Sequence, residues 1–189
     1  LLALTGCATS ETTYLNNGEQ GLAIDCSGEA NSWATCYEKA DASCAGTGYR
    51  IVGTSTSCTH TLKAEYEEML DMRDEDTKAI SHATWDICEF LLDLHEQGRL
   101  DTAFGRLDED LPYHAPCQLR SHGIGLPALD LFALVPGLRA RDMDHDCCGI
   151  AGTYGLKREK YDIAMKVGAP LFAKVKASGA TTAACDSET

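Results

Sequence analysis

Apolar side chains recur at helical spacing over residues 76–97, where they would line one face of a long helix. Asp74 precedes this segment as a helix cap, and Gly98 follows it as a helix terminator. The apolar positions are Ile80, Trp85, Ile87, Phe90, Leu91 and Leu94. Cys88 lies on the same face, so we predict that it belongs to the core rather than to a binding site.

Downstream of this helix, short apolar runs alternate with helical segments. The predicted strands span 111–114, 138–143 and 180–184. The predicted helices span 62–70, 127–134 and 157–177, the last interrupted by Pro170. Strands that alternate with helices indicate a parallel sheet and an α/β fold. Because parallel strands end at one edge of a sheet, the loops that follow them would meet in a common crevice.

The amino-terminal part is predicted to be separate. Residues 1–20 read as a signal remnant and polar linker, 21–57 as a small β-α-β unit, and 58–189 as the larger α/β domain. In the small unit, strands at 21–25 and 49–53 flank a helix at 32–40. A unit of this size has little core, so a disulfide from Cys26 to either Cys36 or Cys44 is expected.

The chain begins with an apolar run that ends in small residues before Cys7. This start resembles the end of a bacterial lipoprotein signal peptide, and residues 1–57 resemble short lipoproteins of unknown function. The resemblance implies that Cys7 carries a lipid anchor. The alternative is an ordinary buried apolar terminus.

Charge and cysteine content narrow the functional classes. The 189 residues include 29 acidic and 16 basic side chains, a net charge of −13 that argues against a nucleic-acid partner. No apolar run is long enough to cross a bilayer. Ten cysteines would form a disulfide scaffold in a secreted protein, and metal ligands or catalytic thiols in a cytosolic one.

The cysteines are most informative at Cys147-Cys148-Gly149. Adjacent cysteines rarely bond to each other, but they can reach two points of a compact object such as an iron–sulfur cluster. Cys117 and Cys185 both follow predicted strands, so four thiols from three loops could meet. The alternative is that the doublet is simply buried and apolar.

This cysteine spacing resembles the cysteine-rich CCG domain family, which occurs in heterodisulfide reductases and in the iron–sulfur subunits of glycolate oxidase. Within that family the chain resembles most closely the cysteine-rich iron–sulfur subunit of anaerobic glycerol-3-phosphate dehydrogenases, over 58–189. The segments that carry the resemblance are 89–98, 113–117, 147–157 and 185–189.

The resemblance implies a [4Fe-4S] cluster held by Cys117, Cys147, Cys148 and Cys185. Cys58 matches a cysteine that closes the first repeat of the family, and we predict that it too binds metal. The family pattern continues with another cysteine beyond Thr189, and lack of that ligand would leave the cluster labile or absent.

The resemblance also implies a role at the cytoplasmic face of the inner membrane. The protein would be an electron carrier rather than the site of hydride chemistry. It would take electrons from flavoprotein dehydrogenase subunits that oxidise glycerol 3-phosphate and pass them towards the membrane quinone pool.

Neighbouring residues have supporting roles in this prediction. His114 and His145 lie within three residues of predicted ligands and would donate hydrogen bonds to them rather than bind the cluster. Gly149 would let the backbone approach closely. Two alternatives remain: a lipid-anchored periplasmic protein without a redox centre, and thiol–disulfide chemistry at Cys147-Cys148, which lacks a Cys-x-x-Cys motif.

Overall fold

The computed structural model describes residues 9–14, 20–25, 42, 48, 50–144 and 146–187. The chain divides into two compact units, Leu1–Arg50 and Ile51–Thr189. In the first unit, β1 (Thr9–Tyr14) and β2 (Gln20–Asp25) pair antiparallel. The linker predicted over 9–20 is therefore wrong for Thr9–Tyr14, because a run rich in threonine and ending in tyrosine suits an extended strand.

The two strands predicted for the small β-α-β unit lie in different sheets. The strand predicted at 21–25 is confirmed as β2, which pairs with β1. The strand predicted at 49–53 is the shorter β3 (Ile51–Gly53), and it pairs in parallel with β4 (Thr84–Asp86) of the second unit. The helix predicted at 32–40 lies outside the described residues, as do Cys7, Cys26, Cys36 and Cys44.

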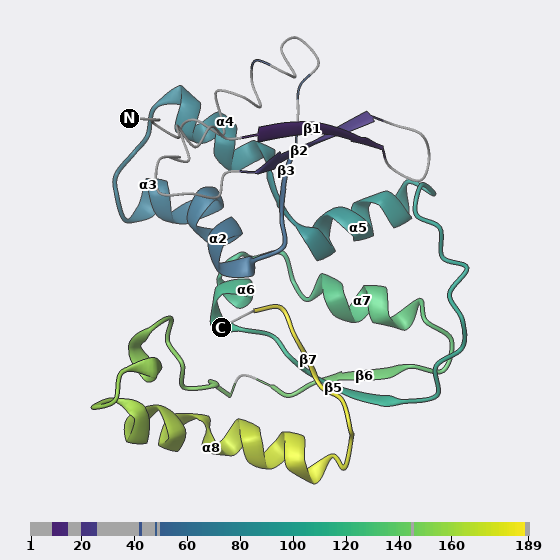
Figure 1. Ribbon diagram of the computed structural model, residues 1–189, viewed down its shortest axis with the longest axis vertical. Helices are drawn as coiled ribbons and strands as arrows, with labels where there is room; N and C mark the ends of the chain where they lie inside the picture. The colour runs from purple at the N-terminus through teal and green to yellow at the C-terminus, as the bar shows by residue number, and fades with distance from the viewer. Residues whose placement is uncertain are drawn as a thin grey trace, which may run out of the picture. The chain divides into compact units, whose positions relative to one another are not determined.

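The second unit is built on a three-stranded parallel sheet in the order β6-β5-β7 (Figure 1). The central strand β5 (Asp110–His114) pairs with β6 (Arg139–Asp142) on one side and β7 (Ala184–Cys185) on the other. Tyr113 is opposite Asp142 in one ladder and Ala184 in the other. The predicted α/β class with a parallel sheet is confirmed.

Helices cover both faces of this sheet. In Figure 1, α5 and α7 lie above the sheet and α8 lies below it. The core gathers around the fully buried Tyr113, whose ring meets that of Phe132 edge-on at 6.0 Å. The helical elements are α2 (Thr56–His60), the π-helix η1 (Thr61–Glu65), α3 (Tyr66–Glu68), α4 (Glu75–Ala83), α5 (Ile87–Glu96), α6 (Cys117–Ser121), α7 (Pro127–Ala133), the 3-10 helix η2 (Tyr154–Leu156) and α8 (Tyr161–Ala177).

The long helix predicted over 76–97 is interrupted by a strand. Asp74 caps the first piece, α4, as predicted, through a bond from the Thr77 amide. Thr84–Asp86 is then extended and pairs with β3. Asp86 starts α5 with a capping box, accepting from the Cys88 amide at 2.9 Å while Glu89 accepts from the Asp86 amide. Helical spacing cannot reveal a strand that is stabilised by a distant partner.

Two glycines allow α8 to lie directly against the Cys147-Cys148-Gly149 loop. A Cβ on Gly149, where φ is +85°, would lie 2.1 Å from the carbonyl oxygen of Ala164. A Cβ on Gly168 would lie 2.5 Å from the carbonyl oxygen of Cys148. The helix runs unbroken through Pro170, contrary to the predicted interruption, and this keeps its packed face continuous.

Substituting Gly149 tests this close approach. Gly149→Ala should lower the free energy of unfolding by about 1–2 kcal/mol for the positive φ, with about 1–3 kcal/mol more for the overlap with α8. Gly152→Ala is the matched control, because Gly152 also has a positive φ but has open space around it. Urea unfolding of both variants gives the comparison; equal losses would contradict the contact.

Candidate metal centre

Four thiols gather at the carboxyl edge of the parallel sheet. Cys117 begins α6 just after β5, Cys147 and Cys148 lie in the loop after β6, and Cys185 ends β7. The Cys117 thiol forms a hydrogen bond with Cys147 and also feels the charge of Cys148, and Cys185 feels the charge of Cys148 as well. The structure therefore brings together the four cysteines that the resemblance selected.

The thiols affect one another's ionisation. Burial raises the pKa of the Cys117 thiol, and the charge of Cys147 and the hydrogen bond with it raise it further. Burial also raises the pKa of Cys185, with a contribution from Cys148. Crowded thiolates repel each other, so a group carrying iron cations would stabilise all of them together. The Gly149 amide donates to the Cys147 sulfur at 3.3 Å, a contact that suits a charged sulfur ligand.

Within the part of the chain that the structure describes, no three His, Cys, Asp or Glu side chains form a group that could hold a metal ion. A cluster makes a different geometric demand, because each thiolate binds its own iron at a different corner of the group. Four mutually interacting thiols from three loops fit that demand by their chemistry and their topology.

The other predicted site residues are placed less centrally. Cys58 is exposed on α2, a helix that contacts α6 through the bond between His122 and the Thr56 carbonyl. His114 is buried in β5 opposite Cys185, and its Nδ1 has no hydrogen-bond partner among the described residues. Burial and then the charge of Arg120 lower the pKa of His114. His145 lies outside the described residues. The roles of Cys58 and His114 stay predictions.

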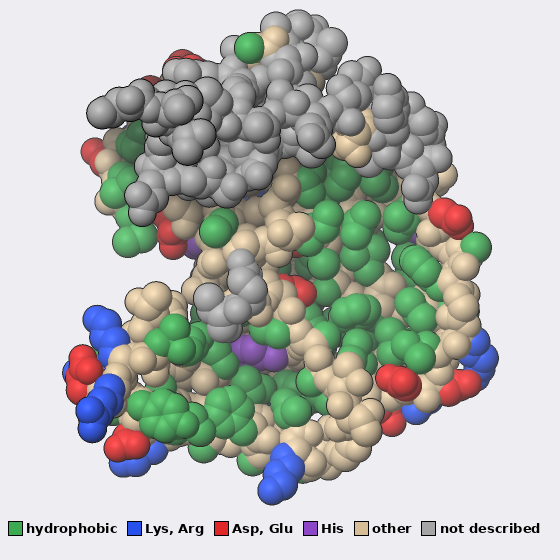
Figure 2. All heavy atoms as spheres, in the orientation of Figure 1, with side chains coloured by type: hydrophobic (Ala, Val, Ile, Leu, Met, Phe, Trp, Pro, Cys, Tyr) green, Lys and Arg blue, Asp and Glu red, His purple; other side chains and the backbone are tan. Residues whose placement is uncertain are grey.

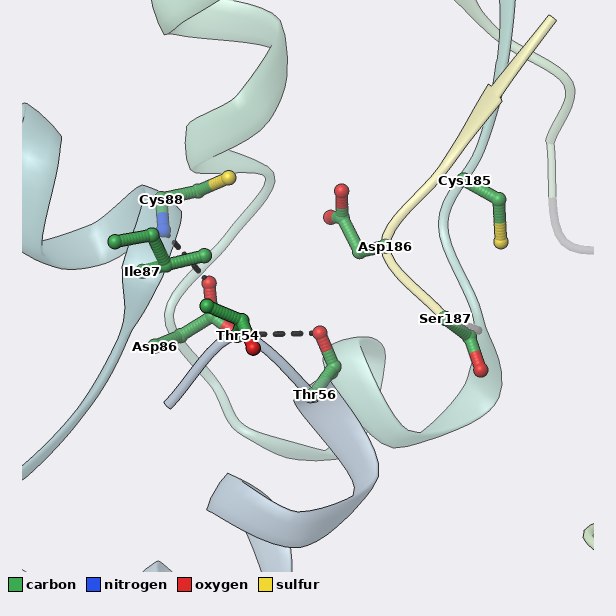
Figure 3. A pocket seen from close by; sticks show the side chains of 8 residues that line it. All are labelled: Thr54, Thr56, Asp86, Ile87, Cys88, Cys185, Asp186 and Ser187. Carbon is green, nitrogen blue, oxygen red and sulfur yellow. Dashed lines mark hydrogen bonds between the residues drawn. The ribbon is translucent and has the colours of Figure 1, made fainter. Parts of the chain in front are cut away.

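A cavity of about 470 Å³ lies on the other side of β7. Asp186 and Cys88 point toward each other there, while the Cys185 sulfur points away from both (Figure 3). This alternation follows from the two-residue repeat of a strand, which sends neighbouring side chains to opposite sides. The cavity is lined by Thr54, Thr56, Asp86, Ile87, Cys88, Cys185, Asp186 and Ser187.

Cys88 packs against the core cluster around Tyr113, so the prediction that it belongs to the core is confirmed. Burial raises its pKa to about 12, and the charges of Asp186 and Asp86 contribute. At neutral pH this thiol is almost entirely protonated, which makes it a poor nucleophile and a poor metal ligand.

Sequence reasoning missed the contact that fixes the end of β7. The Tyr113 hydroxyl donates a hydrogen bond to Asp186, the residue after Cys185. Burial raises the pKa of Asp186, whereas the bond from Tyr113 lowers it. Burial and the same bond raise the pKa of Tyr113. No spacing rule links residues 73 positions apart, so the sequence carried no signal for this pair.

Removing the Tyr113 hydroxyl tests how strongly this bond holds β7. Tyr113→Phe leaves a half-buried carboxyl without its donor and should lower the free energy of unfolding by about 1–3 kcal/mol. Tyr161→Phe serves as a control, because Tyr161 is 56% exposed and its change should stay within about 0.5 kcal/mol. Chemical denaturation measures both, and a Tyr113→Phe variant as stable as the control would refute the role.

Comparison with known proteins gives two curated relatives. The chain is 35% identical over 142 residues to the C subunit of anaerobic glycerol-3-phosphate dehydrogenase from Escherichia coli K12, and equally similar to that of strain O157:H7. The match covers 75% of this chain and 35% of each relative, so the chain spans about a third of their length. The predicted resemblance to this dehydrogenase component is confirmed; the resemblance of residues 1–57 to lipoproteins stays a prediction.

Two other comparisons gave nothing. No protein-family model matches the chain, and no solved structure matches it. Among the described residues, no helix combines the length and apolar character that a membrane span requires.

Proposed function

We propose that this chain is an electron-transfer component of an oxidoreductase of the anaerobic glycerol-3-phosphate dehydrogenase type. The observation that carries the proposal is the hydrogen bond between Cys117 and Cys147, which come from different loops, with Cys148 acting on both Cys117 and Cys185. Similarity to the C subunit of such a dehydrogenase supports the assignment independently.

Cys117, Cys147, Cys148 and Cys185 would hold an iron–sulfur cluster, of the [4Fe-4S] type that the resemblance implies. Such a group accepts and donates single electrons without hydride or proton chemistry of its own. The protein residues supply its ligands, the Gly149 amide that donates to the Cys147 sulfur, and a setting sheltered between the sheet edge and α8.

The partners in this proposal are flavoprotein dehydrogenase subunits as donors and the membrane quinone pool as acceptor. The name of the relatives, a lettered subunit of a dehydrogenase, supports an assembly with other subunits. Electrons would pass through the chain between these partners, while oxidation of glycerol 3-phosphate would take place on another subunit.

We also propose that the chain works at the cytoplasmic face of the inner membrane, bound to the lipid surface through α8. Tyr161, Met165 and Phe172 follow one side of this helix and are 56%, 41% and 43% exposed. Figure 2 shows apolar side chains gathered along α8, with Lys and Arg at its margins. Residues 157–176 hold six basic and two acidic side chains in a chain of net charge −13. An apolar stripe with basic neighbours is typical of helices that lie on anionic membranes.

Iron analysis after anaerobic purification tests the cluster. We expect about four irons and equivalent acid-labile sulfide per chain, because a [4Fe-4S] group contains that many. Cys148→Ser should lose most of the iron, whereas Cys88→Ser should retain it, because Cys88 faces the cavity and packs on the core. Absence of iron and sulfide from the purified, reconstituted chain would overturn the proposal.

Sedimentation with lipid vesicles tests the membrane surface. We expect the chain to bind vesicles containing phosphatidylglycerol and to release them at high salt, because basic residues near a surface attract anionic lipids. The double variant Met165→Ser, Phe172→Ser should bind several-fold more weakly. Ile163→Ser is the matched control: Ile163 is also exposed on α8 but lies off the stripe. Equal binding by the two variants would contradict the proposed surface.

A further inference from the structure

Two cations hold the segment that leads into Cys147. We call this segment the acidic turn and define it as Asp142, Met143, Asp144 and Asp146. It connects the end of β6 to the cysteine doublet, and Asp144 has a φ of +65°, a left-handed conformation that costs a non-glycine residue energy. A turn of this kind persists when surrounding contacts determine it.

The first cation comes from the helix that Cys117 begins. One terminal nitrogen of Arg120 donates to both carboxylate oxygens of Asp142, at 2.9 and 2.8 Å, and to the backbone carbonyl of Asp144 at 2.9 Å. The side chains of Arg120 and Asp142 are both only 22% exposed, so solvent screens this pair less than it would a surface pair. Arg120 therefore joins the helix of Cys117 to the turn before Cys147.

The second cation comes from α8. The ammonium group of Lys174 lies 2.9 Å from a carboxylate oxygen of Asp144 and 2.8 Å from one of Asp146, and it also donates to the Met143 carbonyl at 3.4 Å. Lys174 thus balances two carboxylates, one of which immediately precedes Cys147. The same helix contacts the Cys148 carbonyl at Gly168.

We propose that Arg120 and Lys174 are positioning residues for the cluster, an inference that rests on the function proposed above. Through the acidic turn they set where Cys147 and Cys148 stand relative to Cys117. Lys174 in addition supplies a positive charge that balances the carboxylates beside these ligands. Both residues act through others and touch no ligand sulfur themselves.

The charge on Lys174 makes a prediction for the reduction potential. Reduction adds negative charge to a cluster, so a nearby cation favours the reduced form and raises the midpoint potential. Lys174→Met should shift the midpoint potential to more negative values and alter the electron paramagnetic resonance spectrum of the reduced protein. Lys174→Arg keeps the charge and should restore most of the potential.

Matched controls separate positioning from general effects of substitution. Lys166→Met removes an exposed lysine from the same helix, and Arg141→Gln removes an exposed arginine from β6. Both should keep the wild-type potential. Arg120→Gln should release iron to a chelator several-fold faster than Arg141→Gln, because Cys117 and the doublet lose their connection. Iron-loaded Lys174→Met and Arg120→Gln proteins with wild-type potential, spectrum and iron release would overturn the inference.

A measurement on the iron-free protein distinguishes failure of this inference from failure of the proposed function. Diamide oxidises paired thiols to a disulfide by accepting their hydrogens, and peptide mapping identifies the Cys117–Cys147 product. Positioning predicts that this product forms several-fold more slowly in Lys174→Met and Arg120→Gln than in their controls. Equal rates would overturn the inference even if no form of the chain bound iron, a result that would by itself remove the cluster proposal.

Discussion

The parallel pairing of β5 with both of its neighbours is the constraint on which the rest of the site depends. Three strands that run in one direction must end at one edge, so the segments that follow β5, β6 and β7 begin close together however far apart they are in sequence. Cys117, Cys147 and Cys185 owe their proximity to this topology. Local residues then adjust the geometry: Gly149 and Gly168 bring α8 close, and ion pairs fix the turn between them.

The two faces of β7 serve different purposes. Cys185 faces the other thiols, whereas Asp186 faces a cavity and accepts a bond from the buried Tyr113. A half-buried carboxyl in that position costs stability unless it is bonded or protonated. The central strand therefore contributes the aromatic residue that secures the strand carrying the last predicted ligand, so the core and the candidate metal centre share one support.

The sequence predicted those features that depend on local pattern. The α/β class, the strands at β5 and β6, the cap at Asp74 and the core position of Cys88 follow from periodicity and residue chemistry, and each is present. The break of the long helix at Thr84–Asp86 was missed because its cause is a parallel partner at Ile51–Gly53. The contacts of Arg120 and Lys174 with the acidic turn were missed for the same reason. They join residues 22–31 positions apart, and single-sequence periodicity holds no record of such pairs.

The shortness of β7 has a consequence for how the molecule opens. A strand of two residues at the edge of a sheet has few backbone bonds to break, so it can separate while β5 and β6 remain paired. Local opening of this kind would expose Cys185 before the other three thiols, at a free energy well below that of global unfolding. The sheet thus provides three fixed ligands and one hinged ligand, an arrangement in which a preassembled inorganic core could enter from the β7 side and be enclosed as the strand returns.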